Sequence, residues 1–468
     1  MTKHSAEEST IGLLARTIGA MHAGSVSAAA IEQAKLLLLD TIGCGLAGRG
    51  EPAAQAALKA LSGSTGESAV IGQIARTHVL DAVLLNGTLV RVLDFNDYAI
   101  GKGHGEPETA GHPSDNIPVA LAAGSSRQRS GREILAAIVM GYELYARLQR
   151  AMDRGGQWDG VTASGLVAPA MAGRLMGLSV EKLAHALALG AARSATPSIV
   201  RTGDISATKS LANALVAQAG TQAALLAEHG MTGPLAILDD PRGLGGLFTR
   251  TDRSSLYAPF PPDGAIMHAH VKTYPCINTG QSAVAAALKL HAMLKHDAGT
   301  LSRIEITMAD YKVTKRHQDD PERRNPVSRE AADHSFPFVI AVALIDGAFG
   351  PAQFDGERWR DPAVTSLMSR IVMRRDAAWN ARAPGSYPCA IRAIDAHGNE
   401  HNIEVPYPPG YSRAGLGGKI VLDKFHAVTE SIIDLRDRDR IVDAVMDFDR
   451  SPSAEPLNRA IAIEGKSS

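Results

Sequence analysis

The chain has 468 residues, of which 45% are apolar and 21% are charged, a composition typical of a globular protein. Its formal charge is −1, from 48 basic and 49 acidic side chains, so no overall field would draw it to nucleic acid or to an anionic membrane. The three cysteines, Cys44, Cys276 and Cys389, lie far apart and form no CxxC pair, which excludes a disulfide framework, a four-thiolate cluster and an all-cysteine zinc site.

The N-terminal sequence and the length of the apolar runs indicate where in the cell the protein is expected. The first ten residues, MTKHSAEEST, are polar and lack the apolar core of a secretion signal. No run approaches the roughly 18 apolar residues that a membrane-spanning helix needs. We therefore expect a cytoplasmic protein with no membrane partner.

Apolar residues at helical spacing dominate the first half of the chain. They predict helices over residues 11–23, 25–48, 51–72, 81–93, 118–124, 132–150, 160–177, 180–193, 206–229 and 234–239. The helix over 25–48 is apolar nearly all round, which predicts a buried position. No sustained period of two occurs before about residue 260, so we expect a large all-α helical domain over residues 1–270.

The pattern changes at the proline-rich stretch APFPPDG, which predicts a domain boundary. Beyond it, helices are expected over 279–294 and 331–349. The run LSRIEITMADYKV alternates as a strand does, and SRIVMRRD is a second, short strand candidate. The run CAIRAIDAHGNEHNIEV indicates a hairpin. We expect a smaller α/β lid domain over 271–407, and helices within 408–468 that pack back on the first domain. The predicted fold class is therefore α+β.

Four polar segments interrupt this apolar text. The first, residues 93–116, reads LDFNDYAIGKGHGEPETAGHPSDN, and its glycines and prolines rule out one continuous helix. A solvated surface loop is the ordinary alternative. However, irregular polar segments between buried helices carry function more often than the elements they join.

The second segment, RTGDISATKS, puts Lys209 in the first turn of an apolar helix, with Ser206 or Thr208 as its cap. A lysine there opposes the helix dipole by roughly 0.3–1 kcal/mol, which is a mild argument that it binds an anion. The third, HVKTYPCINTGQSA, carries Lys272 and Tyr274 at the expected domain boundary, and the fourth, RRNPVSREAADHSF, carries Arg324 and His334. A surface lysine, a linker and a helix cap remain the ordinary alternatives.

Taken together, the four segments supply lysines, arginine, histidines and a carboxylate. That combination suits a small di- or tricarboxylate, and it suits removal of a proton beside a carboxylate, because cations hold the developing charge while a histidine moves protons. The HAH pair of His268 and His270 has no carboxylate partner at metal spacing. We therefore expect no metal and no cofactor.

The same segments carry a family resemblance that covers nearly the whole chain. The motifs, in chain order, are KLLLLDTIGCGLAG, NGTLVRVLDFND, GHPSDNIPVALA, GYELYARLQ, ASGLVAPAMAGRLMGLS, ATKSLANALVAQAG, VKTYPCINTGQSAV and REAADHSFPFVIAVALIDG. With these motifs, the chain resembles the MmgE/PrpD family, which includes 2-methylcitrate dehydratase, cis-aconitate decarboxylase and iminodisuccinate epimerase. The resemblance implies a homodimer, a helical domain with an α/β lid, a cleft between them, and no iron–sulfur cluster.

Individual residues match the family's motifs. The resemblance implies catalytic roles for Asp94, His112, Lys209, Lys272 and His334, with His112 as the acid or base. We expect substrate contacts from Asp97, Tyr98, His104, Ser114, Tyr274 and Arg324.

Two departures concern the decarboxylases. Where they have a histidine, this chain reads QWDGVTAS, and their active-site tyrosine falls near Asp320. An insertion with His104 and Glu106 also separates this chain from them, while LDFND followed by HPSDN resembles the dehydratase branch.

The leading hypothesis is a hydro-lyase that dehydrates 2-methylcitrate or a related tricarboxylate. An epimerase, an isomerase or a decarboxylase of a small di- or tricarboxylate is the alternative, because the same residues would serve. A homologue that binds an organic acid without turnover is a third reading.

Overall fold

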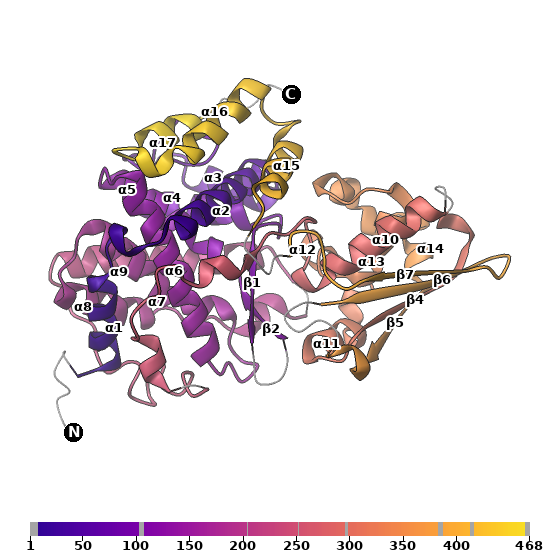
Figure 1. Ribbon diagram of the computed structural model, residues 1–468, viewed down its shortest axis with the longest axis horizontal. Helices are drawn as coiled ribbons and strands as arrows, with labels where there is room; N and C mark the ends of the chain where they lie inside the picture. Colours follow the sequence, from indigo (N-terminus) through magenta and orange to yellow (C-terminus); the bar gives the residue numbers. More distant parts are fainter. Residues whose placement is uncertain are drawn as a thin grey trace.

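The computed structural model describes residues 8–102, 107–203, 205–250, 252–294, 298–381, 387–411 and 416–463. Figure 1 shows a helical body, made by the first half of the chain and the C-terminal helices, beside a smaller body in which helices lie against a sheet. The predicted α+β class, dominated by helices, is confirmed.

The helical body is built mainly from the first nine α-helices and three C-terminal ones. Their bounds are α1 (Thr10–Ala20), α2 (Ala28–Ala47), α3 (Pro52–Ala60), α4 (Val79–Arg91), α5 (Ile117–Ser126), α6 (Gly131–Ala151), α7 (Ser164–Met176), α8 (Val180–Ala191), α9 (Thr208–Glu228), α15 (Gly418–Thr429), α16 (Leu435–Met446) and α17 (Glu455–Ile461). The smaller body contains α10 (Gln281–Met293), β4 (Leu301–Ala309), α11 (Lys312–Asp319), α12 (Arg329–Ala332), α13 (Phe336–Asp346), α14 (Pro362–Met368), β5 (Ile371–Asp376), β6 (Cys389–Asp395) and β7 (Glu400–Val405).

Helix α2 is the centre of the helical body. Its apolar side chains lie nearly all round and are buried, as the sequence predicted, and the Ser27 hydroxyl caps its start by accepting from the Ala30 N–H at 3.1 Å. Helix α15 packs against α2, where Gly43 lets the Phe425 ring approach: a Cβ at Gly43 would lie 3.0 Å from that ring. The C-terminal helices therefore share one apolar core with the first half of the chain.

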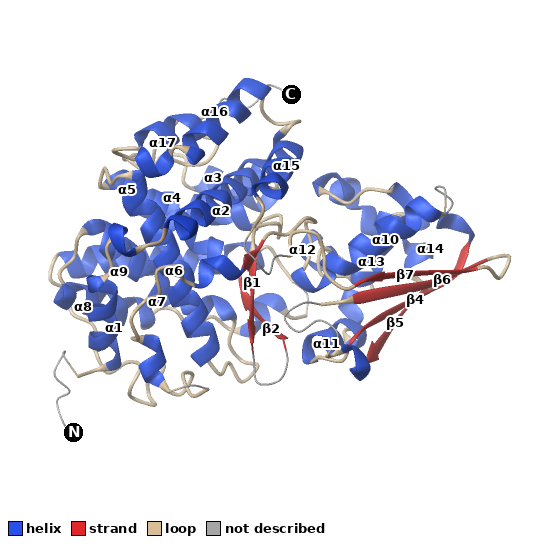
Figure 2. Cartoon of the chain, viewed as in Figure 1, coloured by secondary structure: helices blue, strands red, loops and turns tan. Residues whose placement is uncertain are grey.

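The sheet of the smaller body has the strand order β5-β4-β6-β7. Strand β4 pairs parallel to β5 and antiparallel to β6, and β6 and β7 form the predicted hairpin. Burial alternates along β5 and β6, because one face of the sheet is covered by helices while the other is largely open. Figure 2 shows α10, α13 and α14 on the covered side.

The expectation that the first half is all-α is wrong in one place. A three-stranded sheet of order β2-β1-β3 lies at the edge of the helical body, with β1 (Tyr98–Lys102), β2 (Pro107–Gly111) and β3 (Ala269–His270). Strand β3 pairs with β1 through Tyr98↔His270 and Ala99↔Ala269. Backbone pairing makes this sheet, and its short glycine-rich strands show no alternation that the sequence pattern could have revealed.

Three smaller helix predictions also need correction. The predicted helix over 234–239 is a set of turns, the helix predicted over 51–72 ends at Ala60, and neither Ser206 nor Thr208 caps α9. Glycine and serine follow Ala60 closely, which favours a helix end there.

Among the described residues, no single helix is both long and apolar enough to cross a bilayer. One pair, Phe336–Asp346 with Pro351–Arg360, passes the length and composition test only when its two parts, bent by 113°, are taken together.

Candidate active site

The carboxylate of Asp94 is the meeting point of two lysines from distant parts of the chain. The Lys272 Nζ lies 2.5 Å from Asp94 Oδ1 and donates to the Asp94 carbonyl at 2.8 Å. The Lys209 Nζ, from the first turn of α9, lies 3.4 Å from Asp94 Oδ2. All three side chains are buried. The structure thus places both predicted lysines on one carboxylate.

Asp94 sits in a tight turn directly after α4. Its φ is +49°, in the left-handed region that few residues other than glycine adopt. Arg91, the last residue of α4, forms an ion pair with Asp94 Oδ1 and donates to Asn96 Oδ1 at 3.2 Å. Burial alone would raise the pKa of Asp94, but Arg91 and the two lysines hold it well below its usual range. Asp94 is therefore a carboxylate at neutral pH.

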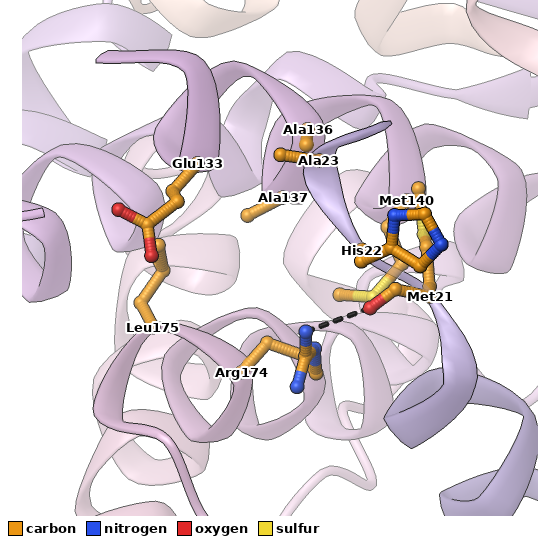
Figure 3. A pocket seen from close by; sticks show the side chains of 9 residues that line it. All are labelled: Met21, His22, Ala23, Glu133, Ala136, Ala137, Met140, Arg174 and Leu175. Carbon is orange, nitrogen blue, oxygen red and sulfur yellow. Dashed lines mark hydrogen bonds between the residues drawn. The ribbon is translucent and has the colours of Figure 1, made fainter. Parts of the chain in front are cut away.

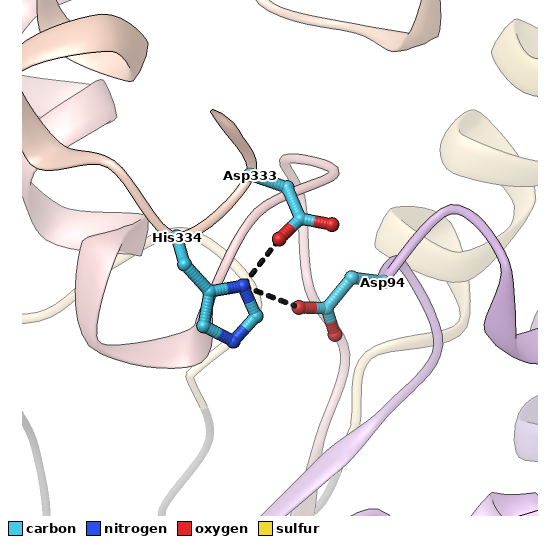
Figure 4. Close-up of side chains that lie close together, drawn as sticks. All are labelled: Asp94, Asp333 and His334. Carbon is cyan, nitrogen blue, oxygen red and sulfur yellow. Dashed lines mark hydrogen bonds and ion pairs between the residues drawn. The ribbon is translucent and has the colours of Figure 1, made fainter. Parts of the chain in front are cut away.

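The smaller body contributes Asp333 and His334, in the turn between α12 and α13. The Lys209 Nζ donates to both oxygens of Asp333, at 2.8 and 2.7 Å. The His334 Nδ1 is hydrogen-bonded to Asp333 Oδ1 and lies 3.8 Å from Asp94 Oδ2, as Figure 4 shows. Burial and Lys209 lower the pKa of His334 to about 4, so its imidazole is neutral.

Six side chains from both bodies therefore form one buried group, which we call the ion cluster: Arg91, Asp94, Lys209, Lys272, Asp333 and His334. With His334 neutral, the group holds three cations and two carboxylates, and Asp115 adds a third carboxylate 3.8 Å from Arg91 Nε. Buried cations held in fixed positions can bind an anionic ligand, because water and salt screen their charge only weakly there.

His112 lies beside the cluster. Its Nδ1 is 2.6 Å from the Asp97 carbonyl oxygen, and because a carbonyl only accepts, Nδ1 carries the proton. The unprotonated Nε2 lies 4.0 Å from Asp94 Oδ1. Burial, then Arg91, lower the pKa of His112 well below its usual value. Its Nε2 is thus a free lone pair on a neutral ring, which is the state of a general base.

Asp97 and Ser114, predicted as substrate contacts, join the two ends of the first polar segment. Asp97 Oδ1 accepts from the Ser114 N–H at 3.2 Å, and Asp97 Oδ2 accepts from the Tyr142 hydroxyl at 2.7 Å. The Asn96 amide donates to Ser114 Oγ at 2.8 Å and to Asp115 Oδ1 at 2.7 Å. Burial raises the pKa of Asp97 to about 7. These bonds hold Asp94 and His112 in a fixed relation.

The remaining predicted contacts lie elsewhere or outside the described residues. Tyr98 is buried in β1, with its ring 5.3 Å from that of His270, and Tyr274 packs edge-on against Phe349 at 6.4 Å. Arg324 is exposed, so the structure does not bring it into the ion cluster. His104 lies outside the described residues.

Arg323, and not the predicted Arg324, is the buried arginine of this motif. Arg323 donates from Nη1 to His317 Nδ1 at 2.6 Å, and His317 Nε2 lies 2.8 Å from the Thr279 hydroxyl. Both arginines stand in the same motif, and only the turn over Pro321–Arg323 decides which one points inward.

Comparison with known proteins fits this geometry. The model of the MmgE/PrpD N-terminal domain matches residues 12–256, and that of the C-terminal domain matches residues 274–448. The chain belongs to the MmgE/PrpD family. This MmgE/PrpD chain is similar over most of its length to dehydratases and decarboxylases. The 2-methylcitrate dehydratase of Salmonella typhimurium is 25% identical over 90% of both chains. The cis-aconitate decarboxylase-like protein oryM of Aspergillus oryzae is 24% identical over 94% of both. The human cis-aconitate decarboxylase is 26% identical over 77% of this chain and 75% of its own.

Sequence reasoning missed one member of the cluster and left others unassigned. Arg91 stands in the apolar text NGTLVRVLD, three residues before Asp94. That spacing puts both side chains on the same side of a helical turn, which was the available signal. Asp333, a member of the cluster, and Asp115, which lies 3.8 Å from Arg91 Nε, stood in the polar segments of this MmgE/PrpD chain without an assigned role.

Three side chains of the cluster resemble a metal-binding group. Ligand atoms of Asp94, Asp333 and His334 lie within 4.8 Å of one another. Both carboxylates, however, are already neutralised by the ammonium groups of Lys209 and Lys272, and a divalent cation there would lie beside two positive charges. The donor set therefore fits a metal ion poorly.

We predict that turnover does not depend on an added metal. Prolonged dialysis against a chelator should leave kcat unchanged, because the two ammonium groups supply the positive charge that a metal would. Activity would be assayed before and after dialysis, with zinc, iron or magnesium added back. Restoration of a lost activity by one of these ions would contradict the prediction.

A small pocket of this MmgE/PrpD protein lies apart from the cluster. It has a volume of about 50 Å³ and lies where the end of α1 meets α6 and α7. Figure 3 shows Arg174 crossing it to donate to the Met21 carbonyl, at 2.7 Å. Its lining contains none of the predicted site residues.

Proposed function

We propose that this protein is a hydro-lyase. It would remove a proton from the carbon beside a carboxylate of a tricarboxylate and expel the hydroxyl group, with 2-methylcitrate or a close relative as substrate. The observation that carries the proposal is the meeting of Lys209 and Lys272 on Asp94, next to the neutral His112. The relatives named above, which are dehydratases and decarboxylases, support the lyase class.

The lysines would bind the substrate and stabilise the charge that develops. A carbon-bound proton beside a carboxylate becomes acidic only where the charge left on the carboxylate oxygens is held by fixed donors. Each ammonium has three N–H donors, and Lys272 directs two of them to Asp94. A third is thus available for a substrate carboxylate. Lys209 already donates to both oxygens of Asp333 and lies 3.4 Å from Asp94 Oδ2, so it would act on the substrate through its positive charge.

His112 would take the proton. Its Nε2 accepts the hydrogen of the C–H bond, the electron pair of that bond becomes the carbon–carbon double bond, and the C–O bond breaks. The departing hydroxyl needs a proton to leave as water. We assign that proton to the Lys209 ammonium, which lies on the other oxygen of Asp94 from Lys272 and 3.3 Å from His334 Nδ1, and which becomes a neutral amine as water leaves. Asp94 orients both lysines and balances their charge.

A substrate panel tests the proposal. The protein, without added metal, would be incubated with 2-methylcitrate, citrate, cis-aconitate and iminodisuccinate, and the products followed by NMR. A vinylic product from 2-methylcitrate is the expected result. Release of carbon dioxide from cis-aconitate would show that the protein is a decarboxylase and not a dehydratase. In heavy water, proton exchange without an alkene would identify an epimerase, and thermal stabilisation by tricarboxylates without turnover would identify a binding protein.

The activity should fall as the pH rises through about 8. Burial lowers the pKa of Lys272 to about 8 even though Asp94 acts to raise it. Below that pH the ammonium is charged and attracts the substrate carboxylate, and above it the charge is lost. A profile of kcat/KM against pH would measure this alkaline limb. In Lys272→Arg, the limb should move to higher pH, because a guanidinium stays charged. A wild-type profile that is flat across pH 8 would contradict this assignment.

The homodimer and the cytoplasmic location remain predictions from the sequence. The first can be measured by light scattering of the purified protein, and the second by fractionation of the source cells.

A further inference from the structure

The backbone turn that carries Asp94 is held from outside by three side chains. The Asp94 carbonyl accepts from Lys272 Nζ at 2.8 Å, and the Asp97 carbonyl lies 2.6 Å from His112 Nδ1. Between these two residues, the Phe95 carbonyl accepts from Lys424 Nζ at 2.6 Å. Buried backbone carbonyls need partners, and here these partners come from three different parts of the chain. Two belong to the site already described, and Lys424 does not.

Lys424 reaches this turn from α15, a helix that follows the smaller body in sequence. Its side chain is buried and lies over the Phe95 ring, with Nζ 4.2 Å from the ring centroid. Its Nζ is also 2.6 Å from Asp40 Oδ1, on the central helix α2. The arrangement parallels that of Lys272: each lysine binds one carbonyl of the turn and one buried carboxylate.

The turn needs such support. Asp94 has a φ of +49°, and a residue other than glycine keeps this conformation only where the surroundings over-determine it. The Asp94 N–H donates to the Arg91 carbonyl at 3.0 Å, which fixes the turn on one side. On the other side, the peptide after Asp94 is fixed by Lys272 through the Asp94 carbonyl, and the next peptide is fixed by Lys424 through the Phe95 carbonyl. Without the bond from Lys424, the backbone after Phe95 would lose this anchor, and the position of Asp94 would depend on its side-chain contacts with Arg91, Lys209 and Lys272.

We propose that Lys424 is a positioning residue of the active site. It anchors the Phe95 carbonyl to Asp40 of α2 and thereby fixes the turn in which Asp94 meets Lys209 and Lys272. The inference rests on the proposed function only for its activity readout, because the shape of the turn can be measured without a substrate. It also gives the C-terminal helices a part in catalysis: they complete a site made by residues far earlier in the chain.

Three variants separate positioning from stability. Lys424→Met removes the anchor but leaves the Asp40 carboxylate buried and unpaired, so it should also lower the melting temperature. The double variant Asp40→Asn/Lys424→Met removes both charges and should recover most of that loss. Lys419→Met, which removes an exposed lysine on the same helix that pairs with the exposed Asp423, is the matched control.

The expected results concern kcat and the turn itself. Both variants that lack Lys424 should lose roughly 10- to 100-fold in kcat, because small displacements of catalytic groups cost that much, while KM changes less. Crystal structures should show Asp94 out of its left-handed conformation, or its contact with Lys272 lengthened. The control should match the wild type in kcat, melting temperature and structure.

Each contrary outcome has one meaning. Wild-type kcat in the double variant, or an unchanged Asp94 turn in its crystal structure, would show that Lys424 serves stability alone and would overturn the proposal. If the wild type converts none of the four acids, the proposed function fails. The structure of the double variant would then still decide whether Lys424 holds the turn, so the two failures are distinguishable.

Discussion

The substitution Lys272→Met should reduce kcat/KM for the tricarboxylate about 10²–10³-fold, the loss that follows removal of one preorganised electrostatic contact. The Lys272 ammonium lies 2.5 Å from Asp94 Oδ1 and is fully buried, so a water molecule would not make up for the lost charge in the variant. The fold should persist, because Asp94 keeps its pairing with Arg91 and Lys209. Steady-state kinetics with 2-methylcitrate, together with a melting curve, would measure both effects.

A matched lysine distinguishes this site effect from a general effect of lost charge. Lys182 on α8 is exposed and donates to the Glu228 carbonyl at 2.7 Å, far from the cluster in sequence. Lys182→Met should retain wild-type kinetics. Near-normal turnover in Lys272→Met, or in Lys209→Met, would remove the two lysines from the mechanism and with them the proposed function.

The substitution His112→Asn should reduce kcat by roughly 10²–10⁴-fold, the usual contribution of a general base. An asparagine amide can take the place of Nδ1 and still donate to the Asp97 carbonyl, whereas nothing takes the place of Nε2. The variant therefore removes the base and keeps the tie that holds the first polar segment together. Substrate affinity, measured by calorimetry, should change little.

Isotope exchange makes this prediction specific to proton removal. In heavy water, the reverse of this step in the wild type should place deuterium in the substrate, and His112→Asn should not do so at a comparable rate. Exchange that continues at the wild-type rate in the variant would assign the base to another group, of which His334 is the nearest candidate.

Much of the fold follows from local patterns. The strands β4 and β5 and the hairpin β6–β7 were predicted because their residues alternate between the helix-covered and open faces of the sheet. Helix α2 was predicted to be buried because it is apolar nearly all round. The sheet β2-β1-β3 could not be predicted, because β3 is two residues long and β1 ends among glycines, so neither carries a period.

The site was predictable by residue type more than by geometry. The motifs contained Asp94, His112, Lys209, Lys272 and His334, and the structure brings these five together. What the motifs could not give is the direction of each side chain. Neighbouring arginines, Arg323 and Arg324, differ only in which side of a short turn they occupy.

Arg91 and Lys424 escaped prediction for a similar reason. Each is a single cation in an apolar helix. The partner of Arg91 is only three residues away, but it lies beyond the end of the helix, whereas Lys424 meets Asp40 and the Phe95 carbonyl only when distant segments pack. A lone cation in an apolar helix is a weak signal, because amphipathic lysines and arginines often reach the solvent from such positions.

The pairing of β3 with β1 sets a strict limit on chain length near the site. Lys272 follows His270 by two residues, and His270 is locked opposite Tyr98, four residues after Asp94. Side chains alternate in direction along an extended chain. One residue inserted between His270 and Lys272 would therefore point the Lys272 ammonium to the opposite side, away from Asp94. The same insertion in the loop before Ala269, at 258–264, would lengthen a surface connection and leave that register untouched. Among related sequences, insertions and deletions should therefore occur in the loop before β3 and be absent between β3 and Lys272.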